Sequence, residues 1–428
     1  MKVVHIDPGA GGTFYCQNCM RDCSLVKALR KQGHDVTMVP MYLPILIDSE
    51  GISGDTPVFF GGINVYLQQR FSIFRKTPRW LDKLFDTGWL LKKAATQEGA
   101  TAAAELGGMT FSMLQGPEGR QKKELDRLIE WLRDQEKPEA IHISNGLLLG
   151  LAAPLKEALG VPIICSLQDE KAWIHGMRDE DEARCWEAMA QHVEHVNQFI
   201  AVSQWYADAM AGHMNIPDSK MSVAYLGVEV HPGEHPPARP DVPVLGYLSK
   251  MTYSLGLGRL VDAFIELKRV PGLENLQLRA TGGQHGDDIG YVAGLKKKLA
   301  QLGLDQDAEF LEEFNSDQRR EFIQSLTVMS VPADEGEAFG LYILEALAQG
   351  VPVVQPDAGG FSEVVTATGG GLLYDVTDPD ALVNSLKSLL LDRQRVDDLA
   401  SHGRDVVMNT FTVDQMAKEV VRVYEALV

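Results

Sequence analysis

The sequence predicts an α/β protein made of two domains, each a parallel sheet with helices on both faces. Short apolar runs alternate with helix-like segments along the whole chain, which is the pattern of parallel sheets covered by helices. The chain has 428 residues, more than one ordinary domain holds. A proline-rich stretch, residues 231–243, separates two series of these runs.

The first series has five strand candidates, which are "KVVHI", "DVTMVPM", "AIHIS", "VPIICSL" and "FIAVS". A glycine loop over residues 9–12 follows the first of them, and we expect a helix to begin near Phe14. On that helix Cys16, Cys19 and Cys23 recur at the spacing of one buried stripe. The pattern favours small buried side chains, although thiols near a helix N-terminus leave a redox or metal role open.

The second series has the candidates "VPVLGYLS", "LQLRATG", "LTVMSVP" and "VPVVQP". Residues 231–243 include five prolines, so they cannot join a helix or a sheet interior and form the predicted linker. We therefore expect an N-terminal domain over 1–230 and a C-terminal domain over 244–410. Residues 411–428 form a predicted helix, for which a return to the first domain stays open. Two such domains would face each other across a ligand-binding cleft.

The composition indicates which kinds of binding partner and which cellular compartment to expect. The 59 acidic and 40 basic side chains give a net charge of −19, which argues against a nucleic-acid partner. Five cysteines and a short N-terminal apolar run predict a cytoplasmic protein. Residues 70–95 are basic and rich in aromatic side chains, so they are either a helical excursion packed on their own domain or a peripheral contact with an anionic membrane or acceptor.

The most informative segment is "ADEGEAFGLYILEALAQGVPVVQPDAGGFSEVV", residues 333–365. It predicts a loop that holds Glu337, a helix from about Leu341 to Gln349, and Glu345 one turn inside that helix. Unpaired amides at the start of a helix, together with the helix dipole, favour a phosphate. The two carboxylates can each accept hydroxyl hydrogen bonds, one sugar on each side of a diphosphate. The segment therefore predicts a sugar-nucleotide site, with the amides of Gly340, Leu341 and Tyr342 at the phosphates and Phe339 as a further donor-binding residue.

This segment resembles the donor-site signature of family 4 retaining glycosyltransferases of GT-B fold. "GAGG", "LRKQGHDVTMV", "VPIICSLQDE", "FIAVSQWY", "YLGVEV" and "GYLSKMTYSLGLGRLVDAF" fall in the family's order. The resemblance implies transfer of a sugar from a nucleoside-diphosphate donor to an unidentified acceptor, with retention of configuration. It implies no metal and no other cofactor, and the chain has no Asp-x-Asp-type pair at a strand end.

The resemblance also implies roles for individual residues. Glu345 would bind the ribose of the donor, and Glu337, the catalytic candidate, would bind the transferred sugar. Gly11 and Gly12 would close over the phosphates from the opposite domain. Lys250 would lie beside the diphosphate.

Some positions depart from the family pattern. Many members have an Arg-x4-Lys-Gly motif where this chain has Lys250 and Leu255, so one of two phosphate-binding cations is absent. Gln168 stands where the family often has His, and Leu226 where it often has Asn. His142 at a strand end is a candidate for a polar role or a structural histidine. These departures leave open a catalytically weak or inactive GT-B scaffold with a binding or regulatory role.

His192 and His195 have the spacing of two zinc ligands on a helix, but no third or fourth ligand follows at a fitting distance. The sequence predicts a solvated helix face there and no metal site. Epimerisation or phosphorolysis on the same fold fits residues 333–365 less well than transfer does.

Overall fold

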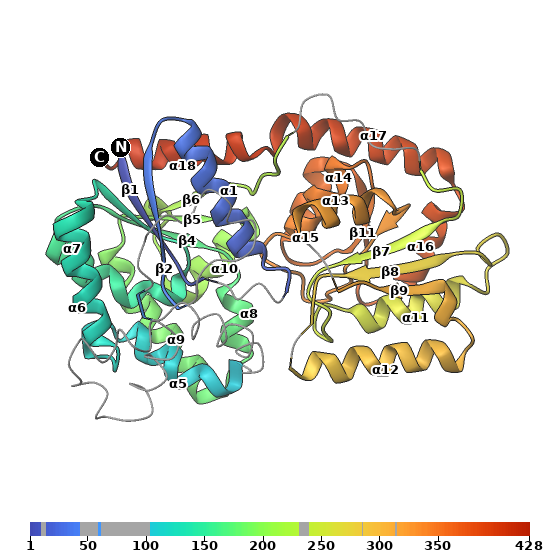
Figure 1. Ribbon diagram of the computed structural model, residues 1–428, viewed down its shortest axis with the longest axis horizontal. Helices are drawn as coiled ribbons and strands as arrows, with labels where there is room; N and C mark the ends of the chain where they lie inside the picture. Colours follow the sequence, from blue (N-terminus) through green and yellow to red (C-terminus); the bar gives the residue numbers. More distant parts are fainter. Residues whose placement is uncertain (10–13, 43–58, 61–102, 231–238, 285, 313–314) are drawn as a thin grey trace. The chain divides into compact units, whose positions relative to one another are not determined.

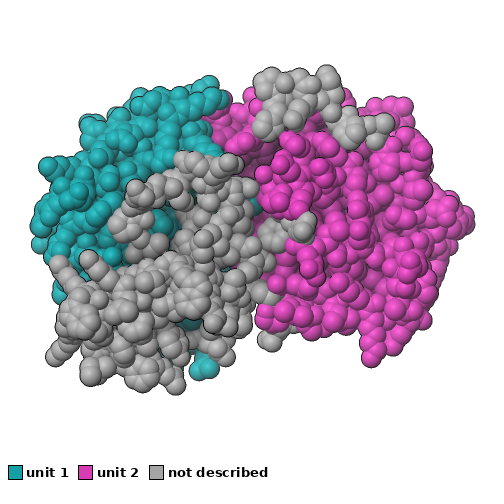
Figure 2. Space-filling model, in the orientation of Figure 1, with its two compact units in different colours: residues 1–12, 18–225, 416–428 teal, residues 13–17, 226–415 magenta. Residues whose placement is uncertain are grey.

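The computed structural model describes residues 1–9, 14–42, 59–60, 103–230, 239–284, 286–312 and 315–428. The chain divides into two compact units (Figure 2). Unit 1 comprises Met1–Gly12, Asn18–Tyr225 and Met416–Val428, and unit 2 comprises Thr13–Gln17 and Leu226–Gln415. Gly11, Gly12 and residues 70–95, for which the sequence predicts donor and membrane contacts, lie outside the described residues.

Unit 1 contains a six-stranded parallel sheet in the order β2-β1-β3-β4-β5-β6 (Figure 1). Its strands are β1 (Lys2–Asp7), β2 (Asp35–Pro40), β3 (Ala140–Ile143), β4 (Ile163–Leu167), β5 (Gln198–Ala201) and β6 (Met221–Val223). Strands β3 and β4 are buried throughout, as expected of central parallel strands covered on both faces. The register places His5 of β1 beside His142 of β3, so two histidines share the interior of this unit.

Among the described residues, seven α-helices accompany these strands in unit 1. They are α1 (Gln17–Lys31, whose first residue belongs to unit 2), α5 (Ala103–Leu114), α6 (Lys122–Trp131), α7 (Ala152–Leu159), α8 (Glu170–His175), α9 (Asp179–Gln191) and α10 (Gln204–Met214). A last helix, α18 (Val413–Glu425), begins in unit 2 and contributes its residues from Met416 onward to unit 1. No helix in the described ranges is long and apolar enough to cross a membrane.

Unit 2 contains a second six-stranded parallel sheet in the order β12-β11-β10-β7-β8-β9. Its strands are β7 (Val244–Leu248), β8 (Gln277–Thr281), β9 (Ala308–Phe310), β10 (Val328–Met329), β11 (Val353–Pro356) and β12 (Gly371–Tyr374). The helices are α11 (Leu257–Leu267), α12 (Asp287–Gln301), α13 (Ser316–Gln324), α14 (Leu341–Ala348), α15 (Gly359–Thr368), α16 (Ala381–Leu390) and α17 (Arg393–Thr410). Figure 1 shows α11 and α12 on one side of this sheet and α13 and α14 on the other.

The predicted fold class is confirmed, since both sheets are parallel and carry helices. One predicted boundary is wrong, because α1 begins at Gln17 and not near Phe14. Phe14 instead forms an antiparallel bridge with Gly283, and the Tyr15 amide donates to the Gly282 carbonyl at 2.8 Å. The backbone that would have opened the helix is therefore extended and paired with unit 2.

Candidate active site

The centre of the site is the start of α14, which follows a loop after β10. Gly340 has φ of +90°, and an added Cβ would lie 2.9 Å from a ring carbon of Phe361 and 3.0 Å from Cδ1 of Ile343. Only glycine combines this left-handed conformation with so close an approach. All side chains of α14 are buried except Glu345, so packing fixes the direction in which the helix presents its first amides.

Glu337 lies in this loop, half-buried, and its carboxylate accepts two side-chain hydrogen bonds. The Tyr342 hydroxyl donates to one oxygen, and Gln17 Nε2 donates to the other at 3.0 Å. Burial raises the pKa of Glu337 to about 6, although the hydrogen bonds from Tyr342 and Gln17 lower it. This carboxyl group is therefore ionised at neutral pH and gains a proton in mildly acidic solution.

Glu345 lies one turn into α14 and is also held by two partners. The Tyr15 hydroxyl donates to Oε2 at 2.7 Å, and Arg319 Nε, from α13, lies 3.3 Å from Oε1. Burial, and then the nearby Glu345 carboxylate, raise the pKa of Tyr15, which keeps its hydroxyl protonated as a donor. The two carboxylates that the sequence predicts to flank the helix start are thus both within the folded site of unit 2.

The sequence predicts that the first amides of α14 are unpaired, and for Leu341 this prediction is wrong. Gln17 Oε1 accepts a hydrogen bond from the Leu341 amide at 2.6 Å. The side chain of one glutamine therefore contacts both the helix N-terminus and Glu337. The position where the sequence predicts a phosphate is satisfied by a neutral amide.

Lys250, predicted to lie beside the phosphates, forms an ion pair with Asp288 at 3.1 Å. Its Nζ also lies 5.6 Å from the centre of the Phe14 ring. Leu255, at the position of the missing family lysine, contributes its carbonyl oxygen to the Tyr247 hydroxyl. The family's second cation therefore has no replacement at that position.

The nearby arginines are engaged elsewhere. Arg259 forms an ion pair with Asp334, and Arg279 pairs with Glu309. Arg319, which no sequence motif marks, contacts the carboxylate of Glu345.

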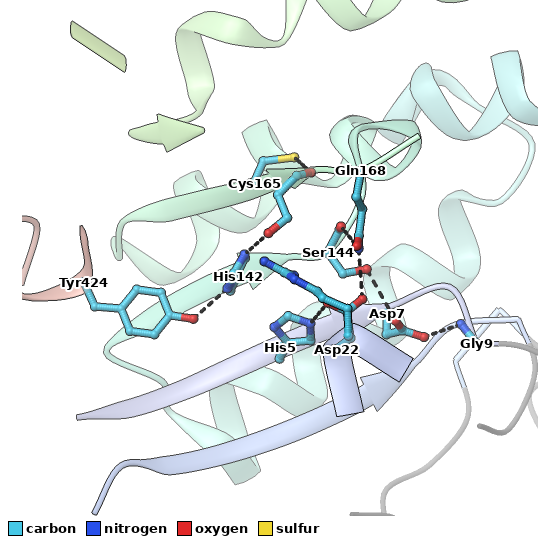
Figure 3. A network of polar contacts seen from close by, with 11 residues as sticks. His5, Asp7, Gly9, Asp22, His142, Ser144, Cys165, Gln168 and Tyr424 are labelled. Atoms are coloured by element: carbon cyan, nitrogen blue, oxygen red, sulfur yellow. Dashed lines mark hydrogen bonds and ion pairs between the residues drawn. The ribbon is translucent and has the colours of Figure 1, made fainter. Parts of the chain in front are cut away.

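His142 and Gln168, the two polar candidates of the first domain, belong to a buried network in unit 1 (Figure 3). His142 Nδ1 lies 2.6 Å from the Tyr424 hydroxyl, and its Nε2 lies 2.8 Å from Ser166 Oγ. Burial lowers the pKa of His142, and the neighbouring His5 and Arg21 lower it further, so the ring is neutral.

Gln168 donates to the Asp22 carboxylate at 3.1 Å and to the Ser144 carbonyl at 2.6 Å. Burial alone would raise the pKa of Asp22, but the adjacent Arg21 and His5 lower it, which keeps the carboxylate charged. Arg21 NH1 contacts Asp22 at 2.6 Å. The network joins strand ends of one sheet to the last helix of the chain, which supports a structural role for His142 and Gln168.

Cys19, Cys23, Cys165 and Cys185 are buried. Cys16 is half-buried and lies just before α1. His192 Nε2 contacts the Leu114 carbonyl at 2.5 Å. Among the described residues no group of three metal-binding side chains comes together.

Three side chains that contact the two carboxylates are not predicted from the sequence, and they are Tyr15, Gln17 and Arg319. Tyr15 and Gln17 directly follow the glycine loop, which is the one signal that could have found them. Arg319 lies in a polar helix with no motif around it, so nothing in the local pattern marks it.

Comparison with known proteins now defines the class. Residues 234–406 match the family model of group 1 glycosyl transferases, and residues 23–227 match that of the glycosyl transferase 4-like domain. The matched ranges include both sheets apart from β1, and the fold matches solved GT-B structures. The chain belongs to the group 1, GT4-like glycosyltransferases of GT-B fold, as the resemblance implies.

Individual relatives are distant. An uncharacterized glycosyltransferase of Methanocaldococcus jannaschii is 24% identical over 304 residues, which cover 68% of this chain and 76% of that protein. The lipopolysaccharide core biosynthesis mannosyltransferase LpsB of Rhizobium meliloti is 30% identical over 187 residues, 43% of this chain and 51% of LpsB. This last match spans about half the length of LpsB.

Two solved structures share the fold over nearly the whole chain. Sucrose-phosphate synthase from Thermosynechococcus elongatus has a TM-score of 0.69 at 17% identity, covering 99% of this chain and 98% of that one. HepE of Anabaena, solved in complex with UDP, has a TM-score of 0.67 at 16% identity and covers all of both chains. At these identities the likeness is one of fold.

Proposed function

We propose that this glycosyltransferase binds a nucleoside-diphosphate sugar at the start of α14 and transfers the sugar to an acceptor hydroxyl. The observation that carries the proposal is the arrangement of Glu337, Glu345 and the Leu341 amide in one loop and one helix of unit 2. Such an amide at a helix N-terminus suits a phosphate oxygen. The carboxylates on either side suit the hydroxyls of two sugars.

In this proposal Glu345 binds the ribose and Glu337 binds the transferred sugar. The bond between the anomeric carbon and the diphosphate oxygen breaks, and its electron pair leaves with the nucleoside diphosphate. The acceptor oxygen forms the new bond to that carbon, and its proton leaves with the diphosphate. Partial positive charge at the start of α14 stabilises the negative charge that develops on the leaving group.

Gly11 and Gly12 are proposed phosphate contacts, and Lys250 is the proposed side-chain cation for the diphosphate. Its ion pair with Asp288 has to loosen for that role. We propose retention of configuration and no metal requirement, both expectations from the family. Uridine is the first base to test, because HepE is solved with UDP and with UDP-glucose.

The test is titration calorimetry of the whole chain with UDP, GDP and ADP, followed by assays with the matching sugar nucleotides. Glu345→Gln should weaken the binding of the preferred nucleotide about tenfold or more, because a ribose acceptor is lost. Glu266→Gln, on the exposed face of α11, removes the same charge away from the site and serves as the control. Absence of binding at millimolar concentration for all three nucleotides would refute the donor site.

A catalytically weak or inactive scaffold is the second candidate, favoured by Leu255 and by the ion pair that holds Lys250. The same calorimetry distinguishes the two. Nucleotide binding without turnover of any sugar nucleotide, with or without candidate acceptors, would favour the scaffold.

The acceptor is not identified. A peripheral contact of residues 70–95 with an anionic membrane is a separate proposal. Co-sedimentation of the protein with vesicles of anionic lipid tests the membrane contact. If neutral vesicles sediment an equal fraction of the protein, the membrane contact is refuted.

A further inference from the structure

The short segment of residues 14–17, which follows the glycine loop, belongs to unit 2 by its contacts. Phe14 pairs with Gly283 as an antiparallel bridge, and the Tyr15 amide donates to the Gly282 carbonyl. Both glycines come directly after β8. The backbone of the segment is therefore attached to the carboxyl end of β8.

Gln17 makes the contacts that the proposed donor would need. Its Oε1 accepts from the Leu341 amide at 2.6 Å, as a phosphate oxygen would. Its Nε2 donates to Glu337 at 3.0 Å, as a sugar hydroxyl would. One amide side chain presents an acceptor and a donor in the places where a sugar phosphate has an acceptor and a donor.

Tyr15 does the same at the other carboxylate. Its hydroxyl donates to Glu345 at 2.7 Å, which is the contact proposed for a ribose hydroxyl. Its ring centre lies 6.4 Å from that of Tyr342 and 5.7 Å from the guanidinium carbon of Arg319, so the ring is packed inside the site and not only hydrogen-bonded at its edge. The third residue, Phe14, lies with its ring beside Lys250.

We propose that residues 14–17 form an autoinhibitory segment that occupies the nucleotide-sugar site and must leave before the donor binds. The proposal rests on the proposed function of that site. The Leu341 amide has one N–H, so it cannot donate to Gln17 and to a phosphate oxygen at once, and Gln17 and Tyr15 each occupy one oxygen of a carboxylate that a donor hydroxyl would need. In the closed state the segment occupies the site, and in the open state it has left. The apparent affinity for the donor is therefore reduced by the ratio of the closed population to the open population.

The experiment compares the wild-type chain with Gln17→Ala and Tyr15→Phe by titration calorimetry with UDP, GDP and ADP. Alanine is a good first residue for α1, and phenylalanine keeps the ring, so each change removes little more than the contacts with the site. We expect each variant to bind the preferred nucleotide about tenfold more tightly than wild type. Gln394→Ala removes a glutamine that donates to Asp398 on exposed α17 and should leave the affinity unchanged.

Weaker or unchanged nucleotide binding in both variants, with wild type binding normally, would overturn the inference and leave the donor site intact. Absence of binding in wild type and in both variants would instead refute the donor site, and the inference with it. Binding by the variants alone would support both.

Hydrogen exchange gives a second readout that does not depend on a variant. With saturating UDP, the Tyr15 amide should exchange faster as its bond to Gly282 is released, while amides at the start of α14 become more protected. Slower exchange of Tyr15 would mean that the segment stays and contacts the nucleotide, which contradicts autoinhibition.

Discussion

The buried carboxyl group of Glu337 should make the stability of unit 2 depend on pH in a defined direction. Below pH 4.5 the group is protonated in both the folded and the unfolded chain. Its folded pKa of about 6 lies above the ordinary value of 4.5, so the folded state holds its proton longer. The stability associated with this group is fully present below pH 4.5 and is lost as the pH rises through 6.

The magnitude follows from the same two values. A difference of about 1.5 pKa units corresponds to about 2 kcal/mol, at 1.36 kcal/mol per unit. Because the side chain is half-buried, this is an upper bound. The free energy of unfolding should therefore fall by at most about 2 kcal/mol, between about pH 4.5 and pH 7, on account of Glu337.

The assay is denaturant unfolding of wild type and Glu337→Gln over this pH range, analysed as the difference between the two proteins. All six tryptophans lie between residues 80 and 205, so tryptophan emission reports unit 1 alone. Circular dichroism reports both units. The pH-dependent difference should appear in the dichroism and not in the tryptophan emission.

Glu335→Gln is the matched control, because Glu335 is exposed in the same loop and carries the same charge. Relative to wild type, Glu337→Gln should gain stability as the pH rises, whatever its absolute stability. A difference that stays flat between pH 4.5 and 7.5, or that falls with pH, would refute the reasoning. So would an equal slope in the Glu335→Gln control.

Three further outcomes follow from single contacts. Gly340→Ala should destabilise unit 2 by about 2 kcal/mol, since the residue has positive φ and close neighbours; a melt unchanged within 1 °C would contradict this. Tyr424→Phe should cost about 1–2 kcal/mol, seen in the tryptophan emission, because buried His142 loses a hydrogen-bond partner; nucleotide affinity should not change. Gln17→Ala should raise the pKa of Glu337 further, because a hydrogen bond that lowers it is removed; a downward move of the pH midpoint would count against that contact.

The strands that sequence pattern predicts and those that it misses differ in their place in the sheets. All inner strands of the two sheets, and the edge strand β2, match runs that the sequence predicts. The missed strands are β6, β9 and β12, which are edges of the two sheets and are mostly half-buried. An edge strand has one neighbour and one side toward solvent, so it needs no continuous apolar run and leaves a weak signal.

The site also contains residues that the sequence pattern predicts and residues that it misses. Glu337, Gly340 and Glu345 are close in sequence, and a loop, a glycine and a helix period place them together. One partner of each carboxylate is distant in sequence, since Tyr15 lies 330 residues from Glu345 and Gln17 lies 320 residues from Glu337. Local pattern carries no information on such contacts. The predicted helix start near Phe14 is wrong for the same reason. The backbone of Phe14 and Tyr15 pairs with Gly283 and Gly282, which are distant in sequence.

The chemistry of Gln17 suits a segment that holds the site and then yields it. An arginine or lysine there would form an ion pair with Glu337, while an aspartate or glutamate would be repelled by it. A neutral amide satisfies both the helix amide and the carboxylate with neutral groups. A diphosphate at the same helix start forms charge-assisted hydrogen bonds, about twice as strong, and gains from the helix dipole. The exchange of glutamine for diphosphate therefore favours the ligand at the helix end, and the ligand's hydroxyls replace Gln17 and Tyr15 at the two carboxylates.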